Sequence, residues 1–192
     1  GRCRQRWGFA GPFLLYVGGN DVRKNVPALL MAWSLAAPKL PGHALAIAGA
    51  MRNEPPFFPD VAGLAARLQL PRLRFLGSVS DTDKHQLLAA CAAFVWPSRY
   101  EGFGLPPLEA MQTGAPVISS DSSAMPEVVG DAGILAPTGD VAALAQAMID
   151  VAGDPELQAR LRASGLARAG QFTWRRTAEL TVASYRKALA QE

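Results

Sequence analysis

Two glutamates bracket a short glycine-containing stretch in the middle of the chain, and carboxylates in this setting can accept hydrogen bonds from sugar hydroxyls. Glu101 stands directly before the glycines, and Glu109 lies about one turn into the following helix, so both can reach a ligand that lies across the helix end. The vicinal hydroxyls of a ribose or hexose are the donors that suit bidentate acceptance. Taken singly, each has a plainer interpretation: Glu109 complements the helix dipole, and Glu101 is a solvated loop charge.

The glycines between the two carboxylates favour an anion site. The apolar run Ala92 to Trp96 predicts a buried strand, and Pro106 and Pro107 mark the first turn of a helix. Gly102 and Gly104 permit backbone angles and close approaches that a Cβ would block. The free amides of the helix start and the positive end of its dipole face the same spot, which suits a phosphate. The combination with the carboxylates predicts a sugar nucleotide.

The whole segment Glu101-Gly102-Phe103-Gly104-Leu105-Pro106-Pro107-Leu108-Glu109 closely resembles the E-x7-E signature of family 4, or group 1, glycosyltransferases, which have the two-domain GT-B architecture. The resemblance implies the C-terminal, donor-binding domain of a retaining hexosyltransferase, similar to mannosyltransferases and serving polysaccharide biosynthesis. It implies that Glu109 binds the ribose and that Glu101 lies near the sugar hydroxyls. The amides of Phe103 to Leu105 would contact the sugar or the diphosphate.

A second group of expected ligand contacts follows the first predicted strand. Lys24 matches the lysine that the resembled family places on the donor diphosphate, so the resemblance assigns catalytic roles to Lys24 and Glu101. Gly18 and Gly19 end the strand and belong to the expected donor site. The family commonly has an arginine where this chain has Gly19. Arg23 either substitutes from a different angle or leaves the donor with one cation fewer.

The segment Phe75-Leu76-Gly77-Ser78-Val79 looks like the family's strand-three loop, whose backbone lines the base pocket. The resemblance therefore adds Ser78 and Val79 to the donor site. Because the resembled family contacts the base there through backbone atoms, the side chains of this segment do not indicate whether the base is uracil or guanine.

The last helix carries an apolar face. Gln171-Phe172-Thr173-Trp174 resembles the family's entry to this helix, with Thr173 as its cap and Trp174 as a packing anchor. The residues at helical spacing on this face are Trp174, Ala178, Val182, Tyr185 and Leu189. In the resembled fold the helix crosses back to an N-terminal domain, so the far end of the face is either uncovered here or packed wholly on this domain.

Short apolar runs alternate with helical patterns along the chain, which predicts a parallel sheet covered by helices on both faces. We expect strands at Phe13 to Val17, His43 to Ala48, Leu73 to Leu76, Ala92 to Trp96, Val117 to Ser119 and Gly133 to Leu135. We expect helices at about Asn25 to Ala37, Val61 to Leu68, Asp81 (as N-cap) to Cys91, from Pro106, and near 140–152, 155–169 and 174–190. The fold class is therefore α/β, a Rossmann-like parallel sheet of about six strands that would be one half of a GT-B fold. Ligands of such sheets lie outside the carboxyl ends of the strands.

The composition fits one soluble domain. The 192 residues, 49% of them hydrophobic, are enough for one core; we expect residues 1–11 to be a tail or linker and residues 12–192 to be the donor-binding domain. No apolar run approaches the roughly 20 residues of a membrane span, and no signal-peptide pattern opens the chain. Two distant cysteines, Cys3 and Cys91, fit a reducing cytoplasm. Peripheral attachment at the inner membrane face through the full-length enzyme is left open.

Other chemistries lack their residue patterns. The turn after the first strand has no G-x-G-x-x-G, which argues against a dehydrogenase. Asp81-Thr82-Asp83 is the only Asp-x-Asp, and because it opens a helix we interpret it as capping and expect no metal. No cofactor is expected either, since the substrate is a nucleoside diphosphate sugar such as a GDP- or UDP-hexose. A net charge of +3 gives no indication of nucleic acid as a partner.

Two alternatives remain open. A sugar-nucleotide epimerase of GT-B fold would act on the donor without an acceptor, and a non-catalytic module would only bind the nucleotide sugar. A transferase instead needs a glycan or lipid-linked acceptor, which the resembled fold holds on an N-terminal acceptor-binding domain. A chain of 192 residues has room for only one such domain, so we expect it to be inactive alone.

Overall fold

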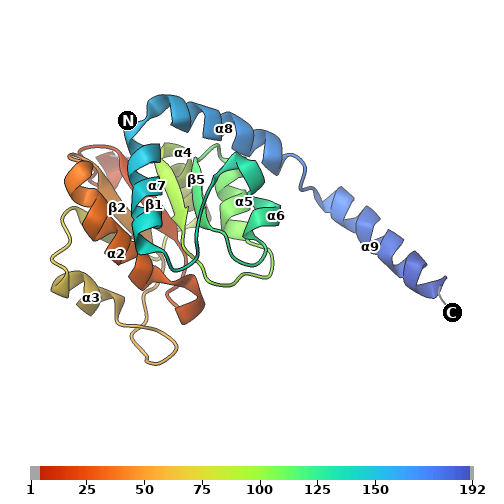
Figure 1. The fold of residues 1–192 in the computed structure, drawn as a ribbon, viewed down its shortest axis with the longest axis horizontal. Helices are drawn as coiled ribbons and strands as arrows, with labels where there is room; N and C mark the ends of the chain where they lie inside the picture. The colour runs from red at the N-terminus through yellow and green to blue at the C-terminus, as the bar shows by residue number, and fades with distance from the viewer. Residues whose placement is uncertain (1–4, 191–192) are drawn as a thin grey trace.

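A parallel sheet of six strands forms the centre of the protein (Figure 1), in a computed structural model that describes residues 5–190. The strand order is β3-β2-β1-β4-β5-β6, and all neighbouring strands pair in parallel. The strands are β1 (Phe13–Val17), β2 (Ala44–Ala48), β3 (Leu73–Gly77), β4 (Ala93–Trp96), β5 (Val117–Ser120) and β6 (Ile134–Ala136). The predicted α/β fold class is confirmed, and each predicted strand is present to within one or two residues.

Burial explains why these segments read as continuous apolar runs. Every residue of β4 and β5 is buried, and so is all of β1 except its last residue. Strands of a parallel sheet have helices on both faces, so neither face keeps a polar alternation. Strand β3 lies at the sheet edge and is mostly exposed, which fits its mixed sequence.

Helices connect the strands and cover both faces of the sheet. They are α2 (Val26–Ala36), α3 (Val61–Arg67), α4 (Asp81–Ala90), α5 (Leu105–Gln112), α6 (Met125–Val128), α7 (Val141–Gly153), α8 (Pro155–Ala169) and α9 (Trp174–Leu189). Three single-turn 3-10 helices are η1 (Val22–Lys24), η2 (Ala37–Lys39) and η3 (Gly130–Ala132). Right-handed crossovers place α2 and α3 on one face, where α2 packs against α7, and α4 and α5 on the other.

The start of α4 corrects one sequence prediction. Its N-cap is Ser80, whose hydroxyl accepts a hydrogen bond from the amide of Asp83 at 3.1 Å. Asp81 is the first helical residue, and its side chain is fully exposed. The backbone is still extended at Ser80, so the capping position falls one residue earlier than the sequence pattern indicated. Asp81 is therefore not the cap.

The residues before β1 contact the domain where the structure describes them. Phe9 is buried and stacks on Phe13, with ring centroids 4.4 Å apart. Arg6 pairs with Asp83 at 2.7 Å. Residues 1–4, including Cys3, lie outside the described residues.

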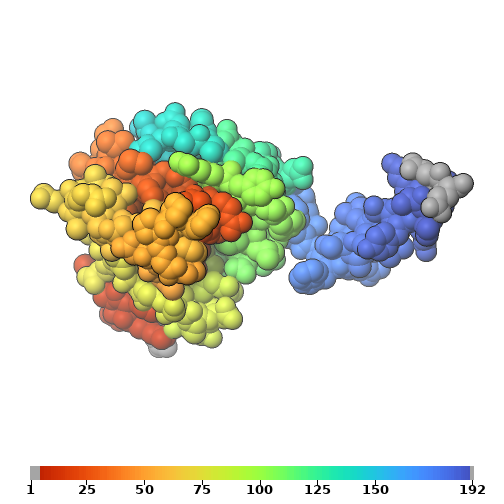
Figure 2. All heavy atoms as spheres, turned by 90° about the horizontal axis from the view of Figure 1, so that it is seen from below, coloured from red at the N-terminus to blue at the C-terminus, as the bar shows by residue number. Residues whose placement is uncertain are grey.

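Helix α9 projects away from the rest of the protein (Figures 1 and 2). Thr173 caps it as predicted, accepting from the amide of Arg176 at 3.1 Å. None of its residues is buried, so the apolar face does not pack on this domain. Trp174 is 87% exposed and does not anchor the helix on this domain, because the chain turns outward directly before it. Among residues 5–190, no helix is both long and apolar enough to cross a membrane.

Candidate functional site

The candidate site lies where the strand order of the sheet reverses. Strands β1 and β4 are neighbours, yet the chain continues from them to opposite sides, so their following loops meet at the carboxyl edge, where open α/β sheets bind ligands in a crevice. Two hydrogen bonds to the carbonyl of Arg23 join these loops. The amide of Arg99 donates to it at 2.7 Å, and the hydroxyl of Ser98 donates at 2.9 Å.

Lys24 and Glu101 meet across this junction. The Lys24 Nζ lies 2.7 Å from the Glu101 Oε1, and the two side chains are only 20% and 12% exposed. The ammonium also lies 4.9 Å from the centroid of the Trp96 ring. Asn25, in the left-handed region with φ of 53°, ends η1 and donates to the carbonyl of Pro97 at 3.3 Å. The two residues assigned catalytic roles from sequence are thus brought into direct contact.

Aromatic rings form the floor under this pair. Tyr16 stacks on Trp96 with centroids 5.3 Å apart, and its hydroxyl donates to the carbonyl of Gly19 at 2.6 Å. Burial, followed by the charges of Asp21 and Glu101, raises the pKa of Tyr16 far above its usual value. Tyr16 therefore stays a neutral donor. Sequence reasoning missed both rings as site residues, since their strands indicated only core.

Gly18 is required by this floor. A Cβ at Gly18 would lie 2.9 Å from the Tyr16 hydroxyl oxygen and 3.1 Å from the Trp96 ring. Nothing lies within 4 Å of a Cβ built on Gly19, so that position faces open space. A long side chain could be accommodated there, but the chain supplies none.

Arg23 does not join the Lys24–Glu101 contact as a hydrogen-bond partner. Its guanidinium Nε donates to Asp21 Oδ1 at 2.8 Å, and the side chain is 63% exposed. This hydrogen bond, together with the charge of Asp21, raises the pKa of the guanidinium. The substitution of Arg23 for the family arginine stays a prediction.

The glycine loop leads into α5 without a side-chain cap. Gly104 is the N-cap with φ of 98°, a conformation that side chains rarely adopt, and a Cβ there would lie 2.1 Å from the Met125 Cε. Pro106 lies at the helix start and has no amide proton. The amide of Glu101 donates to Ser123 Oγ at 2.9 Å, which ties the loop to the segment after β5. Ser123 was missed as a site residue, and no spacing in the sequence indicates this contact.

Glu109 occupies a different part of the site from Glu101. Its Oε2 lies 3.1 Å from the Lys84 Nζ, and Lys84 also lies 3.4 Å from Asp81 Oδ1. Burial acts against the charge of Lys84, but the hydrogen bonds and charges of Glu109 and Asp81 outweigh it and raise the pKa. Lys84 was not singled out from the sequence. Its role depends on α4 and α5 lying side by side.

A cleft of about 380 Å³ opens between α4 and α5. It is lined by Asp81, Lys84, His85, Leu88, Glu109, Gln112 and Thr113. Ser78 and Val79 lie just before α4, after the end of β3, where the amide of Gly49 donates to the carbonyl of Gly77 at 2.8 Å. The predicted base-binding loop therefore leads directly to the cleft.

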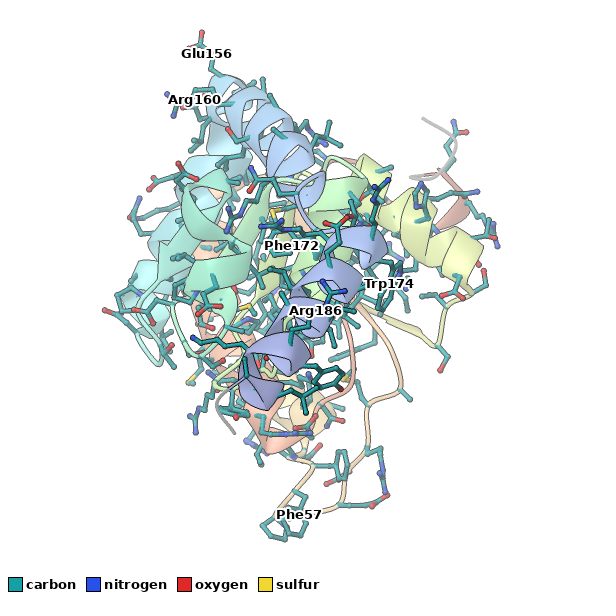
Figure 3. All side chains as sticks on the ribbon, turned by 90° about the vertical axis from the view of Figure 1, so that its right-hand side faces the viewer. Phe57, Glu156, Arg160, Phe172, Trp174 and Arg186 are labelled. Atoms are coloured by element: carbon teal, nitrogen blue, oxygen red, sulfur yellow. The ribbon has the colours of Figure 1, made fainter. Side chains whose placement is uncertain are left out.

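The far side of the glycine loop contacts the entry to α9. Phe103 meets Phe172 edge to face, with centroids 5.8 Å apart. An open groove of about 640 Å³ runs from these rings along α9, past Arg176 and Leu180. Phe172 and Trp174 flank the start of the helix in Figure 3. Among residues 5–190, no group of three or more His, Cys, Asp or Glu side chains could hold a metal ion.

Sequence comparison finds similar proteins that are named for sugar transfer. A family model described as "Glycosyl transferases group 1" matches residues 11–154. O-antigen chain mannosyltransferase B of Escherichia coli is 37% identical over 175 residues, which cover 91% of this chain and 45% of the relative. Glycogen synthase of Mycobacterium tuberculosis is 35% identical over 190 residues, covering 94% of this chain and 45% of the relative. This chain thus spans less than half the length of these curated relatives.

Solved structures give the same picture of the fold. The sucrose-phosphate synthase of Thermosynechococcus elongatus aligns with a TM-score of 0.80 and 28% identity, over 99% of this chain and 49% of that one. Anabaena HepE, solved in complex with UDP and glucose, aligns with a TM-score of 0.82 and 25% identity, over 97% of this chain and 51% of that one.

Proposed function

The chain belongs to the glycosyl transferases group 1 family, and we propose that it is the part of a glycosyltransferase that binds a nucleoside diphosphate sugar. The hexosyl group of this donor is transferred to an acceptor with retention of configuration. The observation that carries the proposal is the contact of Lys24 with Glu101 beside the uncapped start of α5. One cation, one carboxylate and a helix start then face a single crevice, which suits a ligand with both phosphates and hydroxyls.

Each end of such a donor has a matching group in the crevice. Lys24 binds the diphosphate, and the amides of residues 103–105 add neutral donors at the helix start. Glu101 accepts from the sugar hydroxyls and Glu109 from the ribose hydroxyls. A related protein supplies independent support, since Anabaena HepE has been solved in complex with UDP and with UDP and glucose.

The chemical step follows from these positions. The bond between the anomeric carbon and the diphosphate oxygen breaks, and the diphosphate leaves with the electron pair. Lys24 and the helix-start amides stabilise the negative charge that develops on it. The oxygen of an acceptor hydroxyl forms the new bond to the anomeric carbon on the same face of the sugar, and its proton passes to the departing diphosphate oxygen. This scheme requires no acid or base from this chain, because the diphosphate is already a good leaving group and its departing oxygen takes the proton of the acceptor.

The acceptor is held elsewhere in the full protein. Because this chain spans 45% of the length of the mannosyltransferase relative, we assign acceptor binding to an additional domain. The exposed apolar residues of α9 and the groove between Phe103 and α9 are the surfaces that such a domain would cover. Donor and acceptor must be brought together for transfer, so the chain alone lacks half of the active site.

Titration calorimetry against UDP, GDP and ADP and their hexose derivatives tests the proposal. At least one of these nucleotides should bind. Glu109→Ala should lower the affinity for that nucleotide about 10 to 100-fold, because a hydrogen bond to a charged acceptor contributes roughly 1.5 to 3 kcal/mol. Glu156→Ala is the matched control, since Glu156 lies on α8 far from the crevice (Figure 3). Absence of binding by every nucleotide would refute the proposal, and unchanged affinity in Glu109→Ala would remove that residue from the site.

A further inference from the structure

Trp96 differs from an ordinary core residue in the state of its indole N–H. It is the last residue of β4 and is 1% exposed, yet its Nε1 has no hydrogen-bond partner among residues 5–190. Trp33, which is also fully buried, donates its indole N–H to the carbonyl of Pro71 at 2.9 Å. A buried donor without a partner is unfavourable, whereas a phenyl ring would fill much of the same space without that cost. Packing alone therefore does not account for a tryptophan at position 96.

The face of the Trp96 ring contacts a cation. The Lys24 Nζ lies 4.9 Å from the ring centroid, which is within the range over which the ring quadrupole attracts a positive charge. Among the aromatic side chains, tryptophan attracts a cation most strongly. The Lys24 side chain is 20% exposed, so water shields the contact less than it would at an open surface. The contact therefore gives the indole a role that a smaller ring would perform less well.

Other groups hold the Trp96 ring in this orientation. Tyr16 stacks on it with centroids 5.3 Å apart and an angle of 14° between the rings. Phe94 stacks on it as well, at 5.9 Å and 18°. A Cβ at Gly18 would lie 3.1 Å from the ring, so the backbone of Gly18 also lies close to it. The ring therefore cannot turn away from Lys24 unless its neighbours repack.

The two partners of Lys24 affect a diphosphate in different ways. Glu101, at 2.7 Å, accepts one of the three N–H donors of the ammonium and its negative charge repels phosphate. The Trp96 ring carries no net charge and occupies the side of the ammonium that faces the core, so it leaves the donors available. A lysine side chain also loses rotamer freedom when a ligand immobilises it, and a ring that already holds it reduces this cost. This step rests on the donor site proposed above.

We propose that Trp96 is a positioning residue that acts through Lys24. The face of its ring holds the ammonium at the junction of the loops after β1 and β4, where the diphosphate of the donor binds. Trp96 does not touch the donor, so its effect on donor affinity requires the charge of Lys24. The effect also follows the strength with which the side chain at position 96 attracts a cation, in the order Trp, Phe, Leu.

Titration calorimetry with UDP, GDP and ADP on a graded series of variants provides the first test. Trp96→Leu should lower the affinity for the nucleotide that binds best by about three to thirtyfold, because the cation loses its ring. Trp96→Phe should lie between this variant and the wild type. Trp33→Phe is the matched control. It should lower the free energy of unfolding, because the Pro71 carbonyl loses its donor, and leave the affinity unchanged.

The same substitutions in a Lys24→Met background provide the second test. Trp96→Leu and Trp96→Phe should cause no further loss of affinity there, because the cation on which the ring acts is absent. A purely structural role of Trp96 would lower the affinity in both backgrounds. Trp96→Phe keeps a ring in the core, so it gives both measurements even where Trp96→Leu does not fold.

Two results would overturn the role of Trp96 and leave the donor site in place. One is a wild type and a Trp96→Phe variant that bind the nucleotide equally well. The other is an equal loss of affinity on substitution of Trp96 with and without the Lys24 charge. Failure of the wild type to bind UDP, GDP or ADP would overturn the donor site, and the role of Trp96 with it.

Discussion

Breaking the Lys24–Glu101 ion pair should lower the free energy of unfolding by an amount that the geometry sets. At 2.7 Å, two unit charges attract by about 6 kcal/mol for an effective dielectric constant of 20. The side chains are only 20% and 12% exposed, so removing them from water offsets most of this attraction. We expect a net coupling of about 1 to 3 kcal/mol, typical of a hydrogen bond between charged groups.

A double-mutant cycle isolates this coupling. Urea unfolding is measured for the wild type, Lys24→Met, Glu101→Gln and the double variant, and the coupling is the difference between the double effect and the sum of the single effects. Each single variant leaves the remaining partner as a poorly solvated, unpaired charge. The losses in unfolding free energy of the two single variants should therefore add up to more than the loss in the double variant. Arg52 and Glu54 form the control pair. Their side chains are 52% and 58% exposed, and exposed pairs couple by about 0.2 to 1 kcal/mol.

A Lys24–Glu101 coupling no larger than that of Arg52–Glu54 would refute the reasoning. It would mean that the crevice screens the pair as well as open solvent does. Enclosure of the pair between η1 and the loop after β4 would then not strengthen its coupling energy.

Two further predictions concern the glycine loop and the proposed need for an acceptor-binding domain. Gly104→Ala should lower the free energy of unfolding by about 1 to 3 kcal/mol, because φ is 98° and the new Cβ would lie 2.1 Å from the Met125 Cε. Gly102→Ala is the control and should cost much less, since nothing lies within 4 Å of a Cβ at that position. Equal losses for the two variants in urea unfolding would contradict this prediction. The isolated chain should bind its donor but show no acceptor-dependent release of nucleoside diphosphate, and turnover near the rate of the full-length parent would show that it is not half of an active site.

Local sequence patterns were sufficient for the fold. Short runs of three to six mostly apolar residues between glycines, prolines and helical periodicities predicted all six strands. The inner strands are the clearest of these, because strands buried on both faces must be continuously apolar. The helix caps were less certain. Ser80 and Asp81 are both good capping residues, and only the backbone path into α4 decided between them.

The glycine loop and its two glutamates were also readable from the chain. Gly104 adopts the left-handed conformation that its residue type indicated, and α5 begins directly after it. The lysine with which each glutamate pairs could not be predicted from the sequence. Glu101 pairs with Lys24, 77 residues earlier, and Glu109 pairs with Lys84, 25 residues earlier. Such partners depend on which elements are adjacent in space.

Sequence alone determined the strands, the glycine loop and the types of residue that stand in the candidate site. Tertiary structure decided which of those residues meet, because a parallel sheet gathers the carboxyl ends of β1 and β4 at one edge, although Arg23 and Ser98 in their loops are 75 residues apart. It also decided that Tyr16 and Trp96 form the floor of the crevice and that α9 leaves its apolar face uncovered. Periodicity predicts an apolar face on a helix, whereas the surface that covers it depends on the packing of the whole protein.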